Sequence, residues 1–291
     1  MKKKKSKSNI LLALVFLAGL SFLLYPVVSN YLNTRMQSGV VSGYQEYVQT
    51  TNTEEHLRMI SQAKQYNEDL LSLPKGFAMT EEQKAVYNSL LNLSGSGMMG
   101  YLEIPCIDVT LPIYHGTEED VLQQAIGHIE WSSLPVGGES THCVVSGHRG
   151  LPTADLLTHI DRMRLGDRFY LNVLGQTLEY QVDAINVVLP SDTSLLTIEE
   201  GRDYVTLLTC TPYGINSHRL LVRGSRILDG KPTSGTVILT DEIEEISLVY
   251  VIPVALILLV VLGLTGMGVT ALARKKRTKE KPGEQDEATT S

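Results

Sequence analysis

The segment Thr206-Leu207-Leu208-Thr209-Cys210-Thr211-Pro212 is the key to the fold, because it predicts a strand that ends on a cysteine. The residues before it, Asp203-Tyr204-Val205, continue the alternating, β-branched pattern of a half-buried strand. Pro212 and Gly214 then break the strand pattern and begin a loop. A thiol at this point is held by a rigid strand yet remains open to a ligand.

Two other reactive side chains also lie at the ends of predicted strands. Arg219 begins the strand-like run 218–223, and His148 follows the apolar run 143–145. Because strand ends of one sheet can converge, we expect Cys210, His148 and Arg219 to form one site. A thiolate is a nucleophile, an imidazole exchanges its proton, and a guanidinium donates hydrogen bonds to an oxyanion. The pattern therefore predicts cysteine-based catalysis.

The same residues also have purely structural interpretations. A single cysteine such as Cys210 is often a small buried apolar residue, and a histidine between glycines, as at His148, is often a turn residue. Three further arginines compete with Arg219 for the anion-binding role: Arg149, Arg223 and Arg226. From spacing alone, these alternatives remain open.

Two uncharged apolar runs, residues 10–28 and 246–273, are each long enough to cross a bilayer as a helix. Basic residues lie just outside both runs, at residues 2–7 and 274–279. The positive-inside rule then puts both termini in the cytoplasm and the residues between the runs outside the plasma membrane. The alternatives are a cleaved signal peptide for the first run and a buried core helix for the second.

Composition narrows the classes of function and of ligand. The formal net charge is −7 although both tails are basic, so the outside region is acidic and nucleic acid is not an expected partner. The three cysteines allow at most one disulfide, Cys106–Cys143. The histidines and cysteines lack ligand spacing, so we predict no metal and no cofactor. Four histidines are expected to be surface or structural residues: His115, His128, His142 and His159.

The chain divides by composition into seven segments. These are a basic cytoplasmic tail (1–9), a transmembrane helix or signal anchor (10–28), an extracellular helical extension with a linker (29–97), a catalytic barrel (98–230), a connector (231–245), a second transmembrane helix (246–273) and a basic, polar cytoplasmic tail (274–291). Within the extension we expect a polar connector at 29–43 and helices at 44–73 and 81–91, the second begun by the capping box Thr80–Gln83. Ser94-Gly95-Ser96-Gly97 predicts a flexible linker.

From Gly100 onward the apolar residues recur with a period of two. Strands are predicted at 101–104, 109–113, 143–146, 168–174, 177–189, 204–210 and 219–228, with short helices at 118–126 and 153–160. Short strands joined by turns indicate a mainly β fold, a closed or nearly closed β-barrel.

Three segments resemble those of the sortases, the membrane-anchored cysteine transpeptidases of Gram-positive bacteria: TLLTC (206–210), SGHRG (146–150) and NSHRLLVRG (216–224). Over residues 100–228 the sequence resembles the class C, pilus-assembling branch of the sortases. A second, C-terminal membrane span is also typical of that branch. The resemblance implies an eight-stranded barrel with its site in a groove. It also implies that Cys210 is the nucleophile, His148 the general acid/base and Arg219 the oxyanion-binding residue.

The resemblance further implies a reaction. An LPxTG-like sorting signal is cut between Thr and Gly, held as a thioester on Cys210, and passed to a lysine amine of the next pilin subunit. The partners are then pilin subunits with such signals. Two alternatives stay open: a sortase that attaches surface proteins to the cell-wall peptide, and a membrane-tethered binding or assembly module without catalysis.

One family feature is missing from this sequence. Class C members usually carry a lid anchored by an Asp-Pro-aromatic triplet, and no such triplet occurs here. The region before the barrel contains Leu91-Asn92-Leu93 and the small residues 94–97 instead. We therefore expect segment 92–99 not to plug the groove, Met98 and Met99 to pack elsewhere, and Cys210 to be reachable.

Overall fold

The computed structural model describes residues 4–73, 79–228 and 231–232, which all belong to the first of the chain's two compact units, Met1–Glu242. Three helices come first, α1 (Lys4–Thr50), α2 (Thr53–Leu70) and α3 (Glu81–Ser89). The strands follow: β1 (Met98–Ile104), β2 (Val109–His115), β3 (Ile126–His128), β4 (Thr141–Ser146), β5 (Arg168–Val173), β6 (Gln176–Val188), β7 (Asp203–Thr211), β8 (His218–Leu228) and the two-residue β9 (Lys231–Pro232). Between them lie helix α4 (Glu119–Leu122) and 3-10 turns at Pro105–Ile107, Ile160–Arg162 and Ser194–Leu196.

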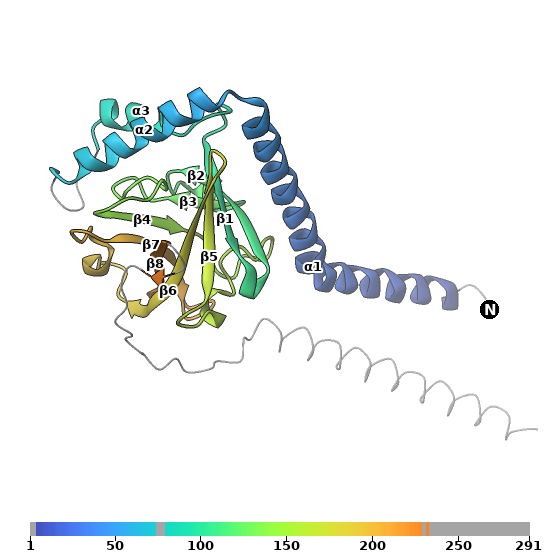
Figure 1. The fold of residues 1–291 in the computed structure, drawn as a ribbon. Coiled ribbons are helices and arrows are strands. Elements are labelled where there is room, and N and C mark those ends of the chain that lie inside the picture. The colour runs from blue at the N-terminus through green and yellow to red at the C-terminus, as the bar shows by residue number, and fades with distance from the viewer. Residues whose placement is uncertain (1–3, 74–78, 229–230, 233–291) are drawn as a thin grey trace, which may run out of the picture. The chain divides into compact units, whose positions relative to one another are not determined.

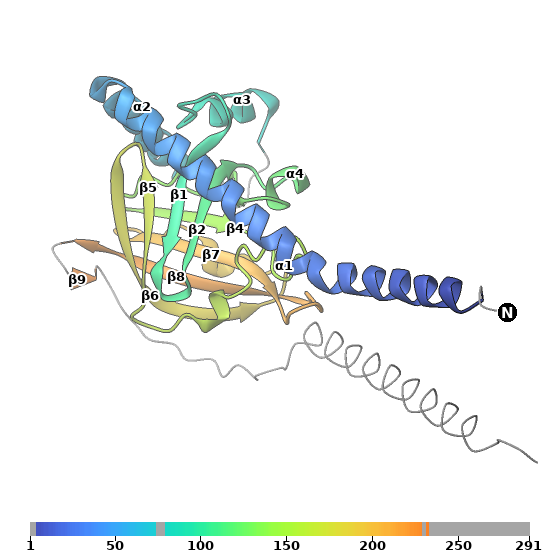
Figure 2. The same ribbon diagram turned by 90° about the vertical axis from the view of Figure 1, so that its right-hand side faces the viewer.

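Strands β1 to β8 form a closed barrel (Figures 1 and 2). The strand order is β6-β5-β1-β2-β3-β4-β7-β8, and an antiparallel pairing of β6 with β8 closes the ring. Two of the pairings are parallel, β2 with β3 and β4 with β7. The prediction of a mainly β, eight-stranded barrel is confirmed.

The barrel interior is filled by alternate residues of the strands. In β7, Val205 and Leu207 are fully buried inside, packed with residues such as Phe169 and Val222. The residues that alternate with them, such as Leu208, face the outside of the barrel, where Leu208 packs against Val144 and Leu221. This period of two is the pattern that the sequence showed, and it decides which side chains reach the outer face.

The predicted hairpin at 168–189 is confirmed as β5 and β6, joined by Leu174 and Gly175. Both turn residues have positive φ, 47° and 78°. That conformation defines the type I′ turn whose twist suits a hairpin, and glycine takes it readily.

The expected connector at 29–43 is wrong, because α1 continues as a helix to Thr50. Tertiary contacts explain the difference: Gln37, Val41 and Tyr44 lie buried against the barrel. The helix expected at 44–73 is also divided, since Asn52 caps a new helix there. The capping box of Thr80 and Gln83 at the start of α3 is confirmed.

The helix expected at 153–160 is also wrong. The segment forms turns, with a bridge between Leu151 and Ala154, and the 3-10 turn begins only at Ile160. Side chains of α1 hydrogen-bond to the loop at Thr153 and Asp155, and Leu156 has a positive φ of 39°. The short helix expected at 118–126 is limited to α4, which is followed by β3.

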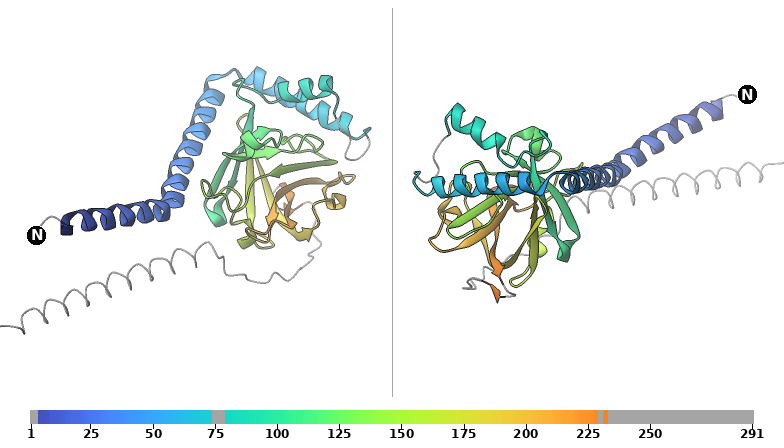
Figure 3. Two further views of the ribbon diagram at one scale, coloured as in Figure 1. Left: turned by 180° about the vertical axis from the view of Figure 1, so that it is seen from behind. Right: turned by 45° about the horizontal axis from the view of Figure 1, so that its top comes forward.

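Helices α2 and α3 cover one end of the barrel (Figure 3). Met59 and Ile60 of α2 and the fully buried Tyr87 of α3 share one apolar cluster with Met99 and Val173 of the barrel. The burial of this apolar surface stabilises the packing of the helices on the strands.

The N-terminal apolar run is helical and long enough to cross a membrane. The helical stretch Leu14–Thr50 contains an apolar 18-residue window, near the N-terminus, none of which is buried. By length and composition this helix fits a membrane anchor. The second predicted span, residues 246–273, lies outside the described residues.

Candidate active site

Cys210 and Arg219 lie directly opposite each other on the antiparallel strands β7 and β8. Residues paired in this way project their side chains from the same face of the sheet. The Arg219 Nη1 atom donates hydrogen bonds to the carbonyl oxygens of Asn216 (3.3 Å) and His218 (3.1 Å). The guanidinium is thereby held at the start of β8, beside the half-buried thiol.

His148 lies beside Cys210 because β4 and β7 run parallel in register. Ser146 pairs with Leu208, and the Gly147 amide donates to the Leu208 carbonyl at 3.1 Å. The Thr209 hydroxyl also donates to the Gly147 carbonyl at 2.7 Å, so the two chains stay together beyond the strand end. The next residue of each chain, His148 and Cys210, is therefore adjacent. The three predicted residues come together at one end of neighbouring strands.

Arg149 fixes the two chain segments that carry His148 and Cys210. Its guanidinium donates to the Thr211 hydroxyl at 2.9 Å and forms an ion pair with Asp161. Because the side chain is only 8% exposed, it has no room for an anionic ligand. Arg149 thus fastens the end of β7 to the loop after β4.

The other competing arginines are also engaged elsewhere. Arg223 makes two hydrogen bonds to the buried carboxylate of Asp183, at 3.0 and 3.2 Å, and its guanidinium lies 4.1 Å from the ring centre of Tyr204. The Arg226 guanidinium lies 5.4 Å from the ring centre of Tyr180. Of the four arginines considered, Arg219 is the one opposite Cys210.

Glu119 is a residue of the site that sequence reasoning missed. Its Oε1 atom lies 3.9 Å from His148 Nε2, a nitrogen that is shielded from solvent and has no hydrogen-bond partner. Glu119 begins the short helix α4, and its side chain is 72% exposed. The acidic run 118–120 was the only sign of this residue in the sequence. Its contact with His148 depends on how the barrel brings the segments after β2 and β4 together.

The other two thiols are unsuited to nucleophilic attack, and all three cysteines are free. Burial raises the pKa of the Cys143 thiol inside the barrel, which suppresses its thiolate. Partial desolvation of the thiol and the nearby Asp167 carboxylate also raise the pKa of Cys106, although this residue is largely exposed near the end of β1. The disulfide Cys106–Cys143 that the sequence allowed does not form.

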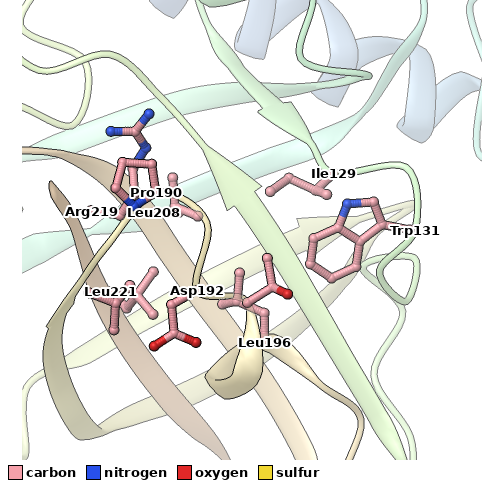
Figure 4. A pocket seen from close by; sticks show the side chains of 10 residues that line it. Ile129, Trp131, Pro190, Asp192, Leu196, Leu208, Arg219 and Leu221 are labelled. Carbon is pink, nitrogen blue, oxygen red and sulfur yellow. The ribbon is translucent and has the colours of Figure 1, made fainter. Parts of the chain in front are cut away.

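A pocket of about 210 Å³ lies next to Arg219 on the outer face of the sheet (Figure 4). Leu208 and Leu221, each two residues from the site on its strand, line the pocket. Trp131 and Arg219 stand on opposite sides of it in Figure 4. The remaining walls come from Ile129 and from the end of β6 and the segment after it, Val188, Pro190, Asp192, Thr193 and Leu196. Sequence reasoning did not find this mostly apolar pocket, because its walls are far apart in the chain.

Of the four histidines expected to be surface or structural residues, three are buried structural residues: His115, His128 and His142. Burial lowers the pKa of His128 and of His142 to about 4, so both rings are neutral at pH 7. Nδ1 of His142 donates to the Thr197 carbonyl (3.0 Å), and its Nε2 accepts from the Thr206 hydroxyl (2.7 Å). Burial likewise lowers the pKa of His115. Within the described ranges, no group of three or more His, Cys, Asp or Glu side chains could hold a metal ion.

The segment before the barrel packs away from Cys210. Asn92 Oδ1 accepts a hydrogen bond from the Gly97 amide at 2.9 Å, and this bond closes the segment into a turn. Met98 and Met99 are buried in apolar clusters with residues of α1, α2 and α3. The two methionines do pack elsewhere, as expected.

This architecture matches known proteins closely. A model of the sortase domain matches residues 102–227. The solved structure of sortase C1 from Streptococcus agalactiae is 46% identical, with 65% of this chain and 98% of that chain covered and a TM-score of 0.64. The chain belongs to the sortase family. Sortase C from Streptococcus pneumoniae is 43% identical, with 67% and 99% covered and a TM-score of 0.57. These neighbours relate this sortase to class C.

Among curated proteins, this sortase is 30% identical to sortase D of Bacillus subtilis over 131 residues. The match covers 44% of this chain and 63% of that protein, so it spans less than two thirds of the relative's length.

Proposed function

We propose that this sortase is a cysteine transpeptidase in which Cys210 is the nucleophile, His148 the general acid/base and Arg219 the oxyanion-binding residue. The observation that carries the proposal is the cross-strand pairing of Cys210 with Arg219, with His148 at the adjoining strand end. A nucleophile, a proton carrier and a fixed cation within one site are the groups that acyl transfer needs.

The first half-reaction forms a thioester. The Cys210 thiolate attacks the Thr carbonyl carbon of an LPxTG-like signal, and Arg219 donates hydrogen bonds to the developing oxyanion. The Thr–Gly C–N bond breaks as protonated His148 gives its proton to the leaving glycine amine. The acyl group is then bound to Sγ of Cys210 and the glycine fragment departs.

The second half-reaction transfers the acyl group. A lysine ε-amine attacks the thioester carbonyl, His148 accepts the amine's proton, and the Cys210 thiolate leaves. Water competes with the amine, so the acceptor must be held close to the thioester. The pocket between Trp131 and Arg219 is well placed to hold apolar side chains of the sorting signal.

For the partner, we propose pilin subunits, with the acceptor lysine on the next subunit. Support comes from class C relatives, since the structure of the Streptococcus pneumoniae enzyme is described as informing pilin substrate specificity. The test incubates this sortase with a pilin that carries a sorting signal and looks for covalent ladders. Ladders that disappear when the acceptor lysine becomes arginine support pilus polymerisation. Transfer only to a cell-wall peptide amine contradicts it and favours the surface-protein alternative.

For the topology, we propose that both termini are cytoplasmic and that the barrel lies outside the plasma membrane. The apolar helix near the N-terminus and the basic flanks of both apolar runs support this arrangement. Protease added to intact protoplasts should digest residues 29–245 and spare tags at both ends. Cleavage of a C-terminal tag would contradict the second span.

A further inference from the structure

Helix α1 lies along the barrel with one continuous face. The residues of that face that contact the barrel follow helical spacing: Asn30, Asn33, Gln37, Val41, Tyr44 and Val48. Such spacings of three and four place them in one stripe. The stripe is apolar at the end far from the predicted membrane span and polar at the near end.

The far end of the stripe is firmly packed. The Tyr44 hydroxyl donates to the Met99 carbonyl at 3.0 Å and accepts from the Leu174 amide at 2.9 Å. Tyr44 is buried with Val41 and Met98 in one apolar cluster. These contacts fix α1 on β1 and on the turn between β5 and β6.

The near end of the stripe binds the loop that follows His148. The Asn30 side chain donates to the Asp155 carboxylate through Nδ2 and accepts from the Asp155 amide through Oδ1 at 2.9 Å. Asn33 Nδ2 donates to the Thr153 carbonyl at 3.2 Å. One turn further on, Gln37 donates to the Gln124 carbonyl at 2.8 Å, just after the helix that carries Glu119. Both chain segments beside the His148 imidazole are thus attached to α1.

The same residues lie where α1 leaves the predicted membrane span. The span ends at residue 28, and a helix rises about 1.5 Å per residue, so Asn30 lies only about 3 Å further along the helix axis. The headgroup layer of each leaflet is roughly 5–8 Å thick. The loop bonded to Asn30 is therefore level with the membrane surface.

We propose that Asn30 and Asn33 are positioning residues, which fasten the loop 150–158, the segment that follows His148 in the chain, to the first turn of α1 outside the membrane. They hold the catalytic end of the barrel at the membrane surface, within reach of a peptide that is itself attached to the bilayer. The benefit for catalysis rests on the proposed transpeptidase function, and it arises because a tethered substrate has a high effective concentration only where the geometry lets it engage.

The test exchanges the two bonded side chains. Asn30→Asp places two carboxylates together, whereas Asn30→Asp combined with Asp155→Asn restores the donor and keeps the acceptor for the residue 155 amide. Ser38→Asp is the matched control, because it adds the same charge to an exposed position of α1. The full-length chain in liposomes is assayed with one sorting-signal peptide in two forms, soluble and attached to a lipid.

Asn30→Asp should lower kcat/KM for the lipid-attached peptide by about fivefold or more, and change the soluble-peptide value by less than about twofold. The exchanged pair should recover both values, and Ser38→Asp should leave both unchanged. Equal losses on the two peptides, or failure of the exchanged pair to recover, would overturn the proposal.

Hydrogen exchange of the loop amides supplies a readout that does not depend on catalysis. Amides of residues 150–158 should exchange faster in Asn30→Asp and return to the original rate in the exchanged pair. Unchanged exchange would refute the attachment itself. If exchange behaves as expected while the unaltered protein cleaves neither peptide, the failure belongs to the proposed transpeptidase function.

Discussion

Cys210 and Arg219 form a cross-strand pair at the end of the β7–β8 ladder, so the barrel itself places a thiol beside a guanidinium. Neither side chain depends on a long loop for its position. Arg219 is further restrained by the carbonyl oxygens of Asn216 and His218. The relationship accounts for a candidate site on a rigid scaffold, with His148, the proposed proton carrier, in the loop that follows the neighbouring strand β4.

Arg219→Lys should remove most of the acylation activity while the fold survives. A lysine keeps the charge but lacks the planar fork of donors, and loss of one oxyanion donor costs about 10²–10³ in kcat. Arg223→Lys is the matched comparison. It should keep acylation but lose about 1–3 kcal/mol of unfolding free energy, because the bidentate contact with Asp183 is broken. If Arg223→Lys removes activity and Arg219→Lys is mild, the assignment is wrong.

Glu119→Gln should slow acylation by about three- to tenfold without changing the melting temperature. The substitution removes the carboxylate that lies 3.9 Å from His148 Nε2, where it attracts the imidazolium formed during proton transfer. Glu118→Gln is the control, since Glu118 pairs with Lys84 instead. Equal losses of the single-turnover acylation rate in the two variants would contradict a specific role for Glu119. They would mean that only the negative charge of residues 118–120 matters.

His142→Gln should make folding stability less sensitive to acid. Burial lowers the pKa of His142 from 6.5 to about 4, so between these values the unfolded chain binds a proton that the folded chain does not. The unfolding free energy therefore falls as the pH drops from about 6.5 to 4, by up to about 1.4 kcal/mol per pH unit for this group. Glutamine can donate to Thr197 and accept from Thr206, so stability at pH 7 should change little. Urea titrations at pH 7 and pH 4.5 test this, and parallel losses in both proteins would contradict it.

Cys210 should be the reactive thiol of the resting enzyme, without prior opening of segment 92–99. That segment packs against the helices through Met98 and Met99 rather than over the site. Asn92→Ala, which removes the bond that closes the segment, should change the Cys210 alkylation rate by less than about twofold. The measurement uses a Cys106→Ser, Cys143→Ser background. A rise of about tenfold, or roughly 1.4 kcal/mol of closure, would identify the segment as a lid.

Most of the barrel strands could be predicted from the sequence, and the three proposed site residues could be picked out, because both depend on local patterns. The three-residue strand β3 was not predicted. Alternation sets which residues of β7 point outward, and family motifs mark Cys210, His148 and Arg219. The packing of residues 29–43 on the barrel was not predicted, because their polar side chains hydrogen-bond to loops that are distant in the sequence. A local sequence pattern contains no information about such contacts. Glu119 and Trp131 were missed for the same reason, since each reaches the site through pairings between distant parts of the chain.

Trapping the acyl-enzyme tests the central claim most directly. The protein is incubated with an LPxTG-like peptide, quenched in acid and digested, and the adduct is located by mass spectrometry. The account predicts the acyl fragment up to Thr on Cys210, its absence in Cys210→Ala, and its persistence in Cys106→Ala and Cys143→Ala. An adduct on Cys106 or Cys143, or cleavage that continues in Cys210→Ala, would contradict it.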